Sequence, residues 1–468
     1  MAAGQPSIAV IGAGFSGLMS AIHLLLKSGE GGPRIYLIEQ SEAFGLGAAY
    51  ATDSGRHVLN TRASSMSVFP DRPGHFMDWL NAQAEIDGVS GTSFITRRTY
   101  GEYLQSLLRE AACGEHAAGR LYLVPDEAVS LERQNGGYAV SLKVGKVLSV
   151  DAVILATGNA PPHPPAIPEP SFFDSPRYID DPWSRDAFAG IAPGDTVLML
   201  GTGLTMVDVA LLVKSHGHEG PLIALSRRGQ VPRSHTDRPA GPPVAAPPLP
   251  PRLSQAVRMV RRLVRESERQ GGSWQQVMDA LRPLAGPYWQ RLPDPVRRRF
   301  LRHLRPWWDV HRHRLAPRPA ERIAALRAEG KLEIRRGRLA RIALEEAPGG
   351  FPVTACWRAA FTGDVACMGV HHVVNCMGPG GDPTRSHSPL IQRLLASGLA
   401  RPDPLRLGIE VDEQGRVTGG DDRPAERLFA LGPPTRGIFW ESTAVPDIRE
   451  HAHRLADTAL ASLERLPA

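Results

Sequence analysis

The sequence predicts an α/β protein with two Rossmann-like dinucleotide-binding domains and a helical insertion. Two glycine-rich loops support this prediction, because each directly follows an apolar run typical of a buried parallel strand. The chain has 468 residues, of which 42% are hydrophobic, and this length allows two or three domains with large cores. One such loop is a weak signal. Two loops about one domain apart predict a flavin and a nicotinamide dinucleotide, and therefore electron transfer.

The first loop begins at Gly12, directly after the apolar run at residues 8–11. Gly12 makes the tight turn, Gly14 lets the backbone approach a pyrophosphate, and Gly17 lets the following helix pack closely against the strand. Glu39 stands at the end of the next predicted strand, where an acid accepts hydrogen bonds from ribose hydroxyls. An ordinary turn of an α/β domain is the alternative, but the flanking pattern favours an FAD-binding loop.

The second loop contains Gly201, Gly203 and Thr205, again after four apolar residues. Met206 occupies the place of the third glycine, so the helix is expected to sit further from the strand or to shift. The next predicted strand ends in Arg227 and Arg228 instead of an acid. Cations at this position suit the 2′-phosphate of NADPH, so we predict NADPH, with NADH possible and solvated surface arginines as the alternative.

The pattern of strands and helices predicts how the chain divides. Residues 1–165 and 375–468 are expected to form a discontinuous FAD-binding domain, and residues 166–374 an NAD(P)H-binding domain that includes a helical insertion at about 252–330. A proline-rich stretch at 239–251 is expected to be an extended linker ahead of the insertion.

Small residues at the ends of three further apolar strands complete the predicted cofactor-binding set. Thr157 and Gly158 end one such strand, Gly378 follows a similar strand, and Gly432 follows the last one. We expect the first two strands near the crossings between domains. Pro433 and Pro434 stand after Gly432 where many flavoproteins have an Asp, so the FAD contact there is expected to come from the backbone.

Composition excludes several other classes. The cysteines are Cys113, Cys356, Cys367 and Cys376; they form no C-x-x-C pair, which disfavours disulfide reductases and zinc sites and fits a reducing, cytoplasmic compartment. The first strand begins within seven residues and no apolar run could span a membrane, so neither a signal peptide nor a membrane partner is expected. The histidine pairs lie two residues apart or adjacent, which puts them on different faces, so no metal site is predicted.

The helical insertion contains many arginines and few acids. A solvated helical face is the first interpretation of this charge, and a funnel for an anionic substrate is the second. Nucleic-acid binding ranks last, because no known nucleic-acid module and no regular aromatic spacing are present, so no nucleic-acid partner is expected. The sequence leaves the oligomeric state open.

Several segments then show a resemblance. They are GAAYAT at 47–52, HVLN at 57–60, MS at 66–67, RTYGEYL at 98–104, GTGLTMVD at 201–208, WWDVHR at 307–312 and GIFWESTAVPDIR at 437–449. In these segments the chain resembles bacterial FAD/NAD(P)-binding oxidoreductases related to flavin-dependent N-hydroxylating monooxygenases. That group includes an aspartate N-hydroxylase and a urate hydroxylase.

The resemblance implies that residues 45–67 wrap the flavin and meet the substrate. It makes His57 and Asn60 candidates for catalytic contacts at the flavin face, although His57 alone is more often a structural histidine. The same stretch adds Tyr50, Met66 and Ser67 to the cofactor-binding set.

Three further residues are substrate candidates, two of them by the same resemblance. Arg98 would be a substrate-facing or structural cation by the resemblance, whereas Arg312 is a candidate because an anionic substrate could enter the arginine-rich insertion near Arg312 or Arg314. Glu441 could orient the C-terminal segment near the flavin, with a role at a helix start as the alternative.

The reaction implied by the resemblance is a monooxygenation. NADPH would reduce FAD, the reduced flavin would form a C4a-(hydro)peroxide with molecular oxygen, and one oxygen atom would pass to a small, nitrogen-containing, anionic metabolite. The alternatives are an NAD(P)H-dependent flavin oxidoreductase without oxygen transfer and a flavin-bound redox sensor or interaction protein.

Overall fold

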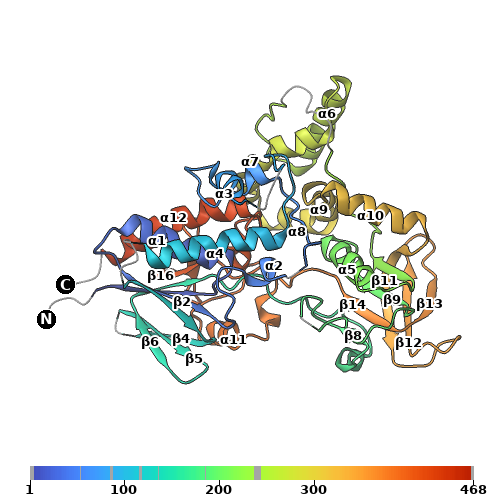
Figure 1. Ribbon diagram of the computed structural model, residues 1–468, viewed down its shortest axis with the longest axis horizontal. Coiled ribbons are helices and arrows are strands. Elements are labelled where there is room, and N and C mark those ends of the chain that lie inside the picture. The colour runs from blue at the N-terminus through green and yellow to red at the C-terminus, as the bar shows by residue number, and fades with distance from the viewer. Residues whose placement is uncertain are drawn as a thin grey trace. The chain divides into compact units, whose positions relative to one another are not determined.

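The computed structural model describes residues 5–52, 54–84, 88–114, 119–134, 136–184, 186–236 and 244–464. The chain divides into two compact units. Unit 1 consists of Met1–Ala160, Arg282–Arg298 and Gly381–Ala468, and unit 2 of Pro161–Leu281 and Arg299–Gly380. Each unit is built around its own largely parallel sheet (Figure 1).

The sheet of unit 1 has six strands in the order β15-β16-β7-β1-β2-β3. Their bounds are β1 Ser7–Ile11, β2 Arg34–Glu39, β3 Leu121–Pro125, β7 Ala152–Leu155, β15 Arg416–Thr418 and β16 Pro424–Ala430. All neighbours are parallel except the pair formed by β15 and β16. A parallel sheet of this kind must be covered on both faces, because its strands are apolar on both sides.

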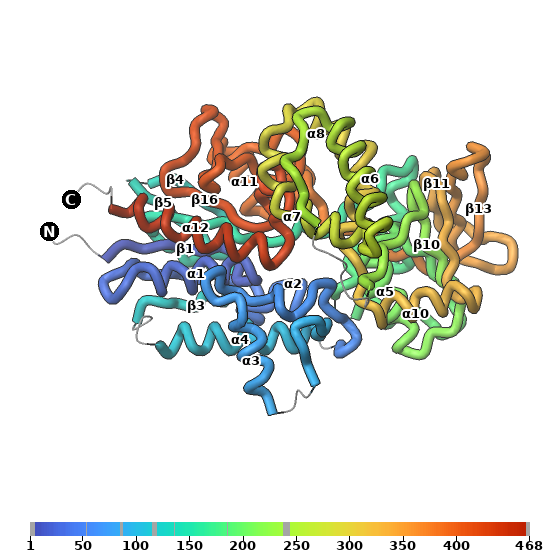
Figure 2. The backbone as a smooth tube through the Cα atoms, turned by 90° about the horizontal axis from the view of Figure 1, so that it is seen from above, coloured from blue at the N-terminus to red at the C-terminus, as the bar shows by residue number. Residues whose placement is uncertain are grey.

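The two faces of this sheet have different covers (Figure 1). One face packs against α1 (Phe15–Ser28), α4 (Arg97–Cys113) and α12 (Val445–Leu463), and α12 lies beside α1 (Figure 2). The other face packs against α11 (Pro389–Ala396) and a three-stranded antiparallel sheet. Alternate residues of β1 separate accordingly: Ile8 and Val10 join the first core, and Ala9 and Ile11 the second.

The remaining elements of unit 1 are short. They are α2 Gly47–Tyr50, α3 His75–Asn81, β4 Ala128–Gln134, β5 Gly137–Leu142, β6 Val147–Val150 and the 3₁₀ turns Ala63–Ser65, Pro383–Arg385 and Pro433–Thr435.

The sheet of unit 2 has seven strands in the order β13-β12-β11-β10-β9-β14-β8. Their bounds are β8 Tyr178–Ile179, β9 Val197–Leu200, β10 Leu222–Ser226, β11 Leu332–Ala343, β12 Val353–Ala359, β13 Val365–Val370 and β14 His372–Asn375. The strands from β11 to β8 are parallel, and β12 and β13 continue the sheet antiparallel. One face packs against α5 (Leu204–Ser215) and α10 (Pro317–Ala328), which confirms the second predicted α/β domain.

The predicted insertion is helical. Its helices are α6 Leu253–Arg269, α7 Trp274–Arg291, α8 Asp294–His303, α9 Arg305–Arg312 and α10 Pro317–Ala328. The expectation placed the whole insertion in the second domain, whereas Arg282–Arg298 clusters with unit 1. Of the predicted linker, residues 239–243 lie outside the described residues, and residues 244–250 form neither helix nor strand.

The cysteines correct one expectation. Cys356 on β12 and Cys367 on β13 stand opposite each other in the antiparallel register and form a disulfide, whereas the sequence predicted a reducing compartment. The two cysteines are eleven residues apart in the sequence and meet because the two strands form a hairpin. Cysteine usage therefore does not support a reducing compartment. Within the described ranges, no helix is both long enough and apolar enough to cross a membrane.

Candidate dinucleotide-binding sites

The loop between β1 and α1 requires glycine at two positions. Gly12 has φ +96°, and a Cβ there would lie 2.4 Å from the carbonyl oxygen of Ala156. A Cβ at Gly17 would lie 1.8 Å from the carbonyl oxygen of Gly12, so the first turn of α1 presses directly onto the loop. These are the two contacts that the sequence pattern assigned to a tight turn and to close packing of helix and strand.

The N-terminus of α1 is suited to a pyrophosphate. Gly14 caps the helix without a side-chain hydrogen bond, and no acid stands in the first turn. Its backbone N–H groups and the positive end of the helix dipole can therefore bind an anion. Gly47 lies against the same loop with φ +53°, where a Cβ would approach the Cα of Gly14 to 3.0 Å. A side chain at either glycine would narrow this cradle, so the residues present fit the phosphates of FAD.

Glu39 is held at the rim of this loop. Its Oε2 accepts a hydrogen bond from the backbone N–H of Ala13 at 2.9 Å. Its Oε1 accepts from the backbone N–H of Ser41 at 3.2 Å and from the Ser41 hydroxyl at 3.3 Å. These bonds orient the carboxylate, whose remaining lone pairs can accept hydrogen bonds from ribose hydroxyls.

Two further predicted segments meet the loop at the same edge of the sheet. Thr157 and Gly158 directly follow β7, Gly158 has φ +72°, and the Cα of Thr157 would lie 3.2 Å from a Cβ at Gly12. Gly432 follows β16 with φ +80°, and a Cβ there would lie 2.4 Å from the hydroxyl oxygen of Ser16 in α1. The carboxyl ends of three neighbouring strands thus converge on one place, as expected for a dinucleotide site.

Tyr50, Met66 and Ser67 lie together in unit 1. The Tyr50 ring lies 4.9 Å from that of Tyr100, between ring centroids, and burial raises the pKa of the Tyr50 phenol. The Tyr100 hydroxyl donates to the carbonyl of Met66 at 3.0 Å, and Arg449 Nη1 donates to the carbonyl of Ser67 at 2.9 Å. The Ser67 hydroxyl donates to a carbonyl five residues later at 2.6 Å. These bonds tie residues 66–67 to α4 and α12.

His57 and Asn60 occupy different environments. The His57 side chain is buried, its Nδ1 lies 2.8 Å from the Thr52 hydroxyl, and its carbonyl accepts a hydrogen bond from the N–H of Arg97 at 2.8 Å. Asn60 is half-buried, and its Oδ1 accepts from the Thr61 hydroxyl at 3.4 Å. A catalytic role for either residue stays a prediction.

The three predicted substrate residues occupy different environments. Arg98 lies on the exposed face of α4 and pairs with Glu102 at 3.2 Å, one helical turn away. Glu441 is buried, and its carbonyl accepts from the N–H of Ala444 directly before α12, as a residue at a helix start would. Arg312 is half-buried at the end of α9 in unit 2.

The loop between β9 and α5 repeats the first turn. Gly201 has φ +120°, and a Cβ there would lie 2.2 Å from the carbonyl oxygen of Cys376, after which Gly378 has φ +80°. Gly203 caps α5 without a side-chain bond, so the first turn, which includes Thr205, can also bind a pyrophosphate. Met206 is fully buried at the position of the third glycine.

The two predicted arginines after β10 differ. The Arg228 guanidinium donates to the carbonyls of Arg302 and His303, at 3.1 and 3.3 Å, and so caps the C-terminal end of α8. Arg227 is exposed. Arg336 is a cation that the sequence analysis missed: it stands opposite Ser226 in the parallel pairing of β10 and β11. It belongs to the Arg335-Arg336 pair within β11, and this pair is informative only once the strand order shows that β11 lies beside β10.

Comparisons with known proteins agree with this geometry. Residues 9–160 match the FAD-NAD(P)-binding family model. An L-aspartate N-monooxygenase (nitrosuccinate-forming) from Streptomyces cremeus is 32% identical over 167 residues, which are 32% of this chain and 23% of that protein. A nitrosuccinic acid synthase from Aspergillus oryzae is 25% identical over 213 residues, 43% of this chain and 31% of that protein. The matched regions thus span about a quarter to a third of the length of these relatives.

A solved structure shows the fold over nearly the whole chain. The L-lysine 6-monooxygenase from Pseudomonas syringae is similar at a TM-score of 0.64 and 16% identity, covering 98% of this chain and all of that one. At this identity the likeness concerns the fold alone, and it confirms the α/β class with Rossmann-type domains. The family match over residues 9–160, together with the two curated relatives, confirms the resemblance to FAD/NAD(P)-binding oxidoreductases.

Proposed function

We propose that the chain is an FAD-dependent, NADPH-consuming monooxygenase that N-hydroxylates a small, anionic amino compound. The observation that supports this most is the repetition of one phosphate-binding geometry, at Gly12 in unit 1 and at Gly201 in unit 2. One dinucleotide would serve as a bound redox cofactor, and the other would be consumed as the reductant.

In unit 1, the protein's part is to bind and orient FAD. The first turn of α1 would hold the pyrophosphate, Glu39 would hold the ribose, and the backbone at Gly158 and Gly432 would line the rest of the site. Bound FAD supplies hydride acceptance and the activation of molecular oxygen. The chain's own residues supply position and exclusion of water, and this explains why no catalytic triad was apparent in the sequence.

In unit 2, side chains at the end of β10 and beside it on β11 favour NADPH. Ser226 ends β10 without an acid, and its hydroxyl lies 2.9 Å from that of Thr202 in the glycine loop. Arg227 and Arg336 flank this position, and the Arg336 guanidinium lies 4.2 Å from the centroid of the Phe361 ring, which limits its motion. We propose Arg227 and Arg336 as the cations for the 2′-phosphate, because Arg228 is used at the end of α8.

The proposed substrate is a small amino acid, with molecular oxygen as co-substrate. The curated relatives support this class, since one is named for oxidising L-aspartate and the other for making nitrosuccinic acid. Among the substrate candidates, Glu441 is buried and Arg312 half-buried, each within its own unit. The Arg98 side chain is 63% exposed and paired with Glu102, so it fits a protected site less well. His57 and Asn60 stay candidates for contacts at the flavin face.

The test uses the purified protein loaded with FAD. We expect NADPH to bleach the flavin without oxygen, and L-aspartate or a related amino acid to speed NADPH oxidation in air with formation of a hydroxylated product. NADPH oxidation that yields only hydrogen peroxide with every amino acid would favour the oxidoreductase without oxygen transfer. A protein that takes up no FAD would contradict the proposal altogether.

A further inference from the structure

A segment of the helical insertion belongs to unit 1 and is bound there through tryptophan. We call residues 282–298 the return segment. Within it, Trp289 is 3% exposed, and its Nε1 donates a hydrogen bond to the carbonyl of Gly437 at 2.8 Å. Its ring packs on that of Trp440, itself 4% exposed, with 4.6 Å between ring centroids. A buried tryptophan that satisfies its N–H and packs on a second aromatic ring is strongly fixed in orientation.

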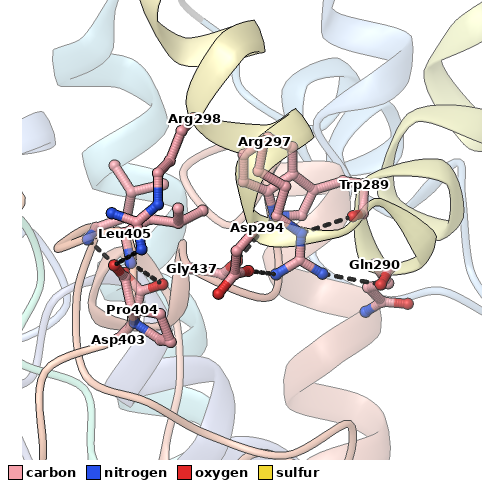
Figure 3. A network of polar contacts seen from close by, with 10 residues as sticks. Trp289, Gln290, Asp294, Arg297, Arg298, Asp403, Pro404, Leu405 and Gly437 are labelled. Atoms are coloured by element: carbon pink, nitrogen blue, oxygen red, sulfur yellow. Dashed lines mark hydrogen bonds and ion pairs between the residues drawn. The ribbon is translucent and has the colours of Figure 1, made fainter. Parts of the chain in front are cut away.

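Arg297 contacts both the backbone and the ring of Trp289 (Figure 3). Its Nε donates to the carbonyl of Trp289 at 3.0 Å, and its Nη2 donates to that of Gln290 at 2.8 Å. Its guanidinium also lies 5.3 Å from the centroid of the Trp289 ring. Arg297 therefore binds the last carbonyls of α7 and covers the indole at the same time.

Two more arginines attach the return segment at its ends. Arg282 pairs with Asp447, in the first turn of α12, at 2.7 Å, and both side chains are about three-quarters buried. Arg298 donates to the carbonyl of Pro404 at 3.0 Å (Figure 3). The return segment thus contacts residues that precede and residues that follow the turn at 437–443 in the sequence. We call this turn the FWES turn.

The FWES turn and the helix after it lead to the proposed flavin site. Before the turn, Gly432 lies against Ser16 at the start of α1. After the turn, Arg449 on α12 donates to the carbonyl of Ser67. Within the turn, Ser442 is fully buried, and its hydroxyl has no hydrogen-bond partner in the described part of the chain. A buried hydroxyl without a partner is costly, so this position is suited to a group of a bound ligand.

We propose that the return segment positions the FWES turn for the flavin-dependent reaction, with Trp289 as the positioning residue. The proposal rests on the proposed function. Trp289 is attached to the turn at Gly437 through its N–H and at Trp440 through its ring, so it determines where Glu441 and Ser442 lie. Loss of this attachment should leave FAD bound through the loop at Gly12 but disturb the surroundings of its ring system.

The test separates the two contacts of Trp289. Trp289→Phe keeps a ring and removes the N–H, and Trp289→Leu removes both. We expect Trp289→Leu to retain FAD, to change the flavin's visible circular dichroism, to lower kcat by about tenfold with a small change in the NADPH KM, and to release more hydrogen peroxide per NADPH. For each of these measurements, the value for Trp289→Phe should lie between those for Trp289→Leu and the wild type. Trp307→Phe, in the half-exposed tryptophan of α9, is the matched control.

Arg297→Gln keeps the test valid if Trp289→Leu fails to fold. It removes the contacts of Arg297 with Trp289 but leaves the tryptophan side chain in the core. It should change the flavin circular dichroism in the same direction, by less. Wild-type circular dichroism and peroxide yield in both Trp289→Leu and Arg297→Gln would overturn the proposal. The circular dichroism needs only bound FAD. A wild-type protein that binds FAD but does not oxidise NADPH would therefore refute the proposed function and leave the positioning test intact.

Discussion

The two glycine loops share a backbone and differ in their side chains. Gly12 and Gly201 both adopt positive φ, and a Cβ at either would collide with the carbonyl that ends a neighbouring strand, that of Ala156 or of Cys376. The backbone bonds also correspond: the loop N–H binds the carbonyl of the second strand at 2.8 Å in both units. The backbone therefore sets the turn, because this glycine conformation leads the chain directly from the end of a parallel strand into a helix.

The differences lie where each loop meets its helix and its second strand. The first turn of α1 closes with a bond of 2.9 Å from the N–H of Leu18 to Gly14, and the corresponding bond in α5, from Val207 to Gly203, is 3.3 Å. The longer bond accompanies the buried Met206 at the place of the third glycine. The two candidate dinucleotide sites therefore share the backbone of the turn, and they differ in the side chains around it.

The largest expected effect comes from breaking the close contact that only the first loop has. Gly17→Ala places a methyl group 1.8 Å from the Gly12 carbonyl, against backbone that cannot move aside. We expect a loss of about 1–3 kcal/mol in the free energy of unfolding and no retained FAD, measured by denaturation and by flavin absorbance. Gly31→Ala is the control, since a Cβ at Gly31 meets nothing within 4 Å. A Gly17→Ala protein that keeps FAD would contradict the packing argument.

Acid should weaken unit 1 through His23 on α1 and His451 on α12. Burial, then the nearby His453 and Lys27, lowers the pKa of His23 to about 4, and burial lowers that of His451 to about 4. A lowered folded pKa means that the stabilisation is complete above the unfolded value of about 6.5 and is lost as the pH falls toward 4.

The expected loss is up to about 3 kcal/mol from His23 between these pH values, read from urea unfolding at several pH values. His23→Gln should flatten this slope, because the substitute does not titrate. An unchanged slope in that variant would show that His23 is not the group responsible.

Arg227 after β10 and Arg336 within β11 should decide whether NADPH or NADH is used. We expect Arg227→Ala and Arg336→Ala each to raise the NADPH KM about tenfold and to leave the NADH KM nearly unchanged, because only NADPH carries the 2′-phosphate. Steady-state kinetics with both nucleotides measure this. If both KM values rise together, the arginines bind a part that the two nucleotides share.

The smallest effect is expected at Arg98. Its ion pair with Glu102 is exposed, and pairs of this kind contribute about 0–1 kcal/mol. Arg98→Gln should therefore change the free energy of unfolding by no more than about 1 kcal/mol. It should change the KM of the amino acid by no more than about twofold. A large rise in that KM would instead support the implied role of Arg98 as a substrate-facing cation.

Much of the fold follows from local sequence. The apolar runs before Gly12 and Gly201 and the acid at Glu39 lie within a few dozen residues of one another, so the spacing alone shows their relation. The small antiparallel sheet β4-β5-β6 and the strand β13 escaped prediction, because short strands with one exposed face carry few apolar residues. A motif marks the loop glycines in the sequence, whereas only the position on a neighbouring strand marks Arg336.

The sequence by itself determined the two phosphate loops, since a glycine that must adopt positive φ or leave room for a carbonyl is visible in one short window. The tertiary structure alone decided the pairing of Cys356 with Cys367 and the attachment of Trp289 to Gly437. It also decided that Arg228 caps the end of α8. Each of these contacts joins segments whose distance in space depends on strand order and register. Those depend on how the whole core packs, and no local pattern records them.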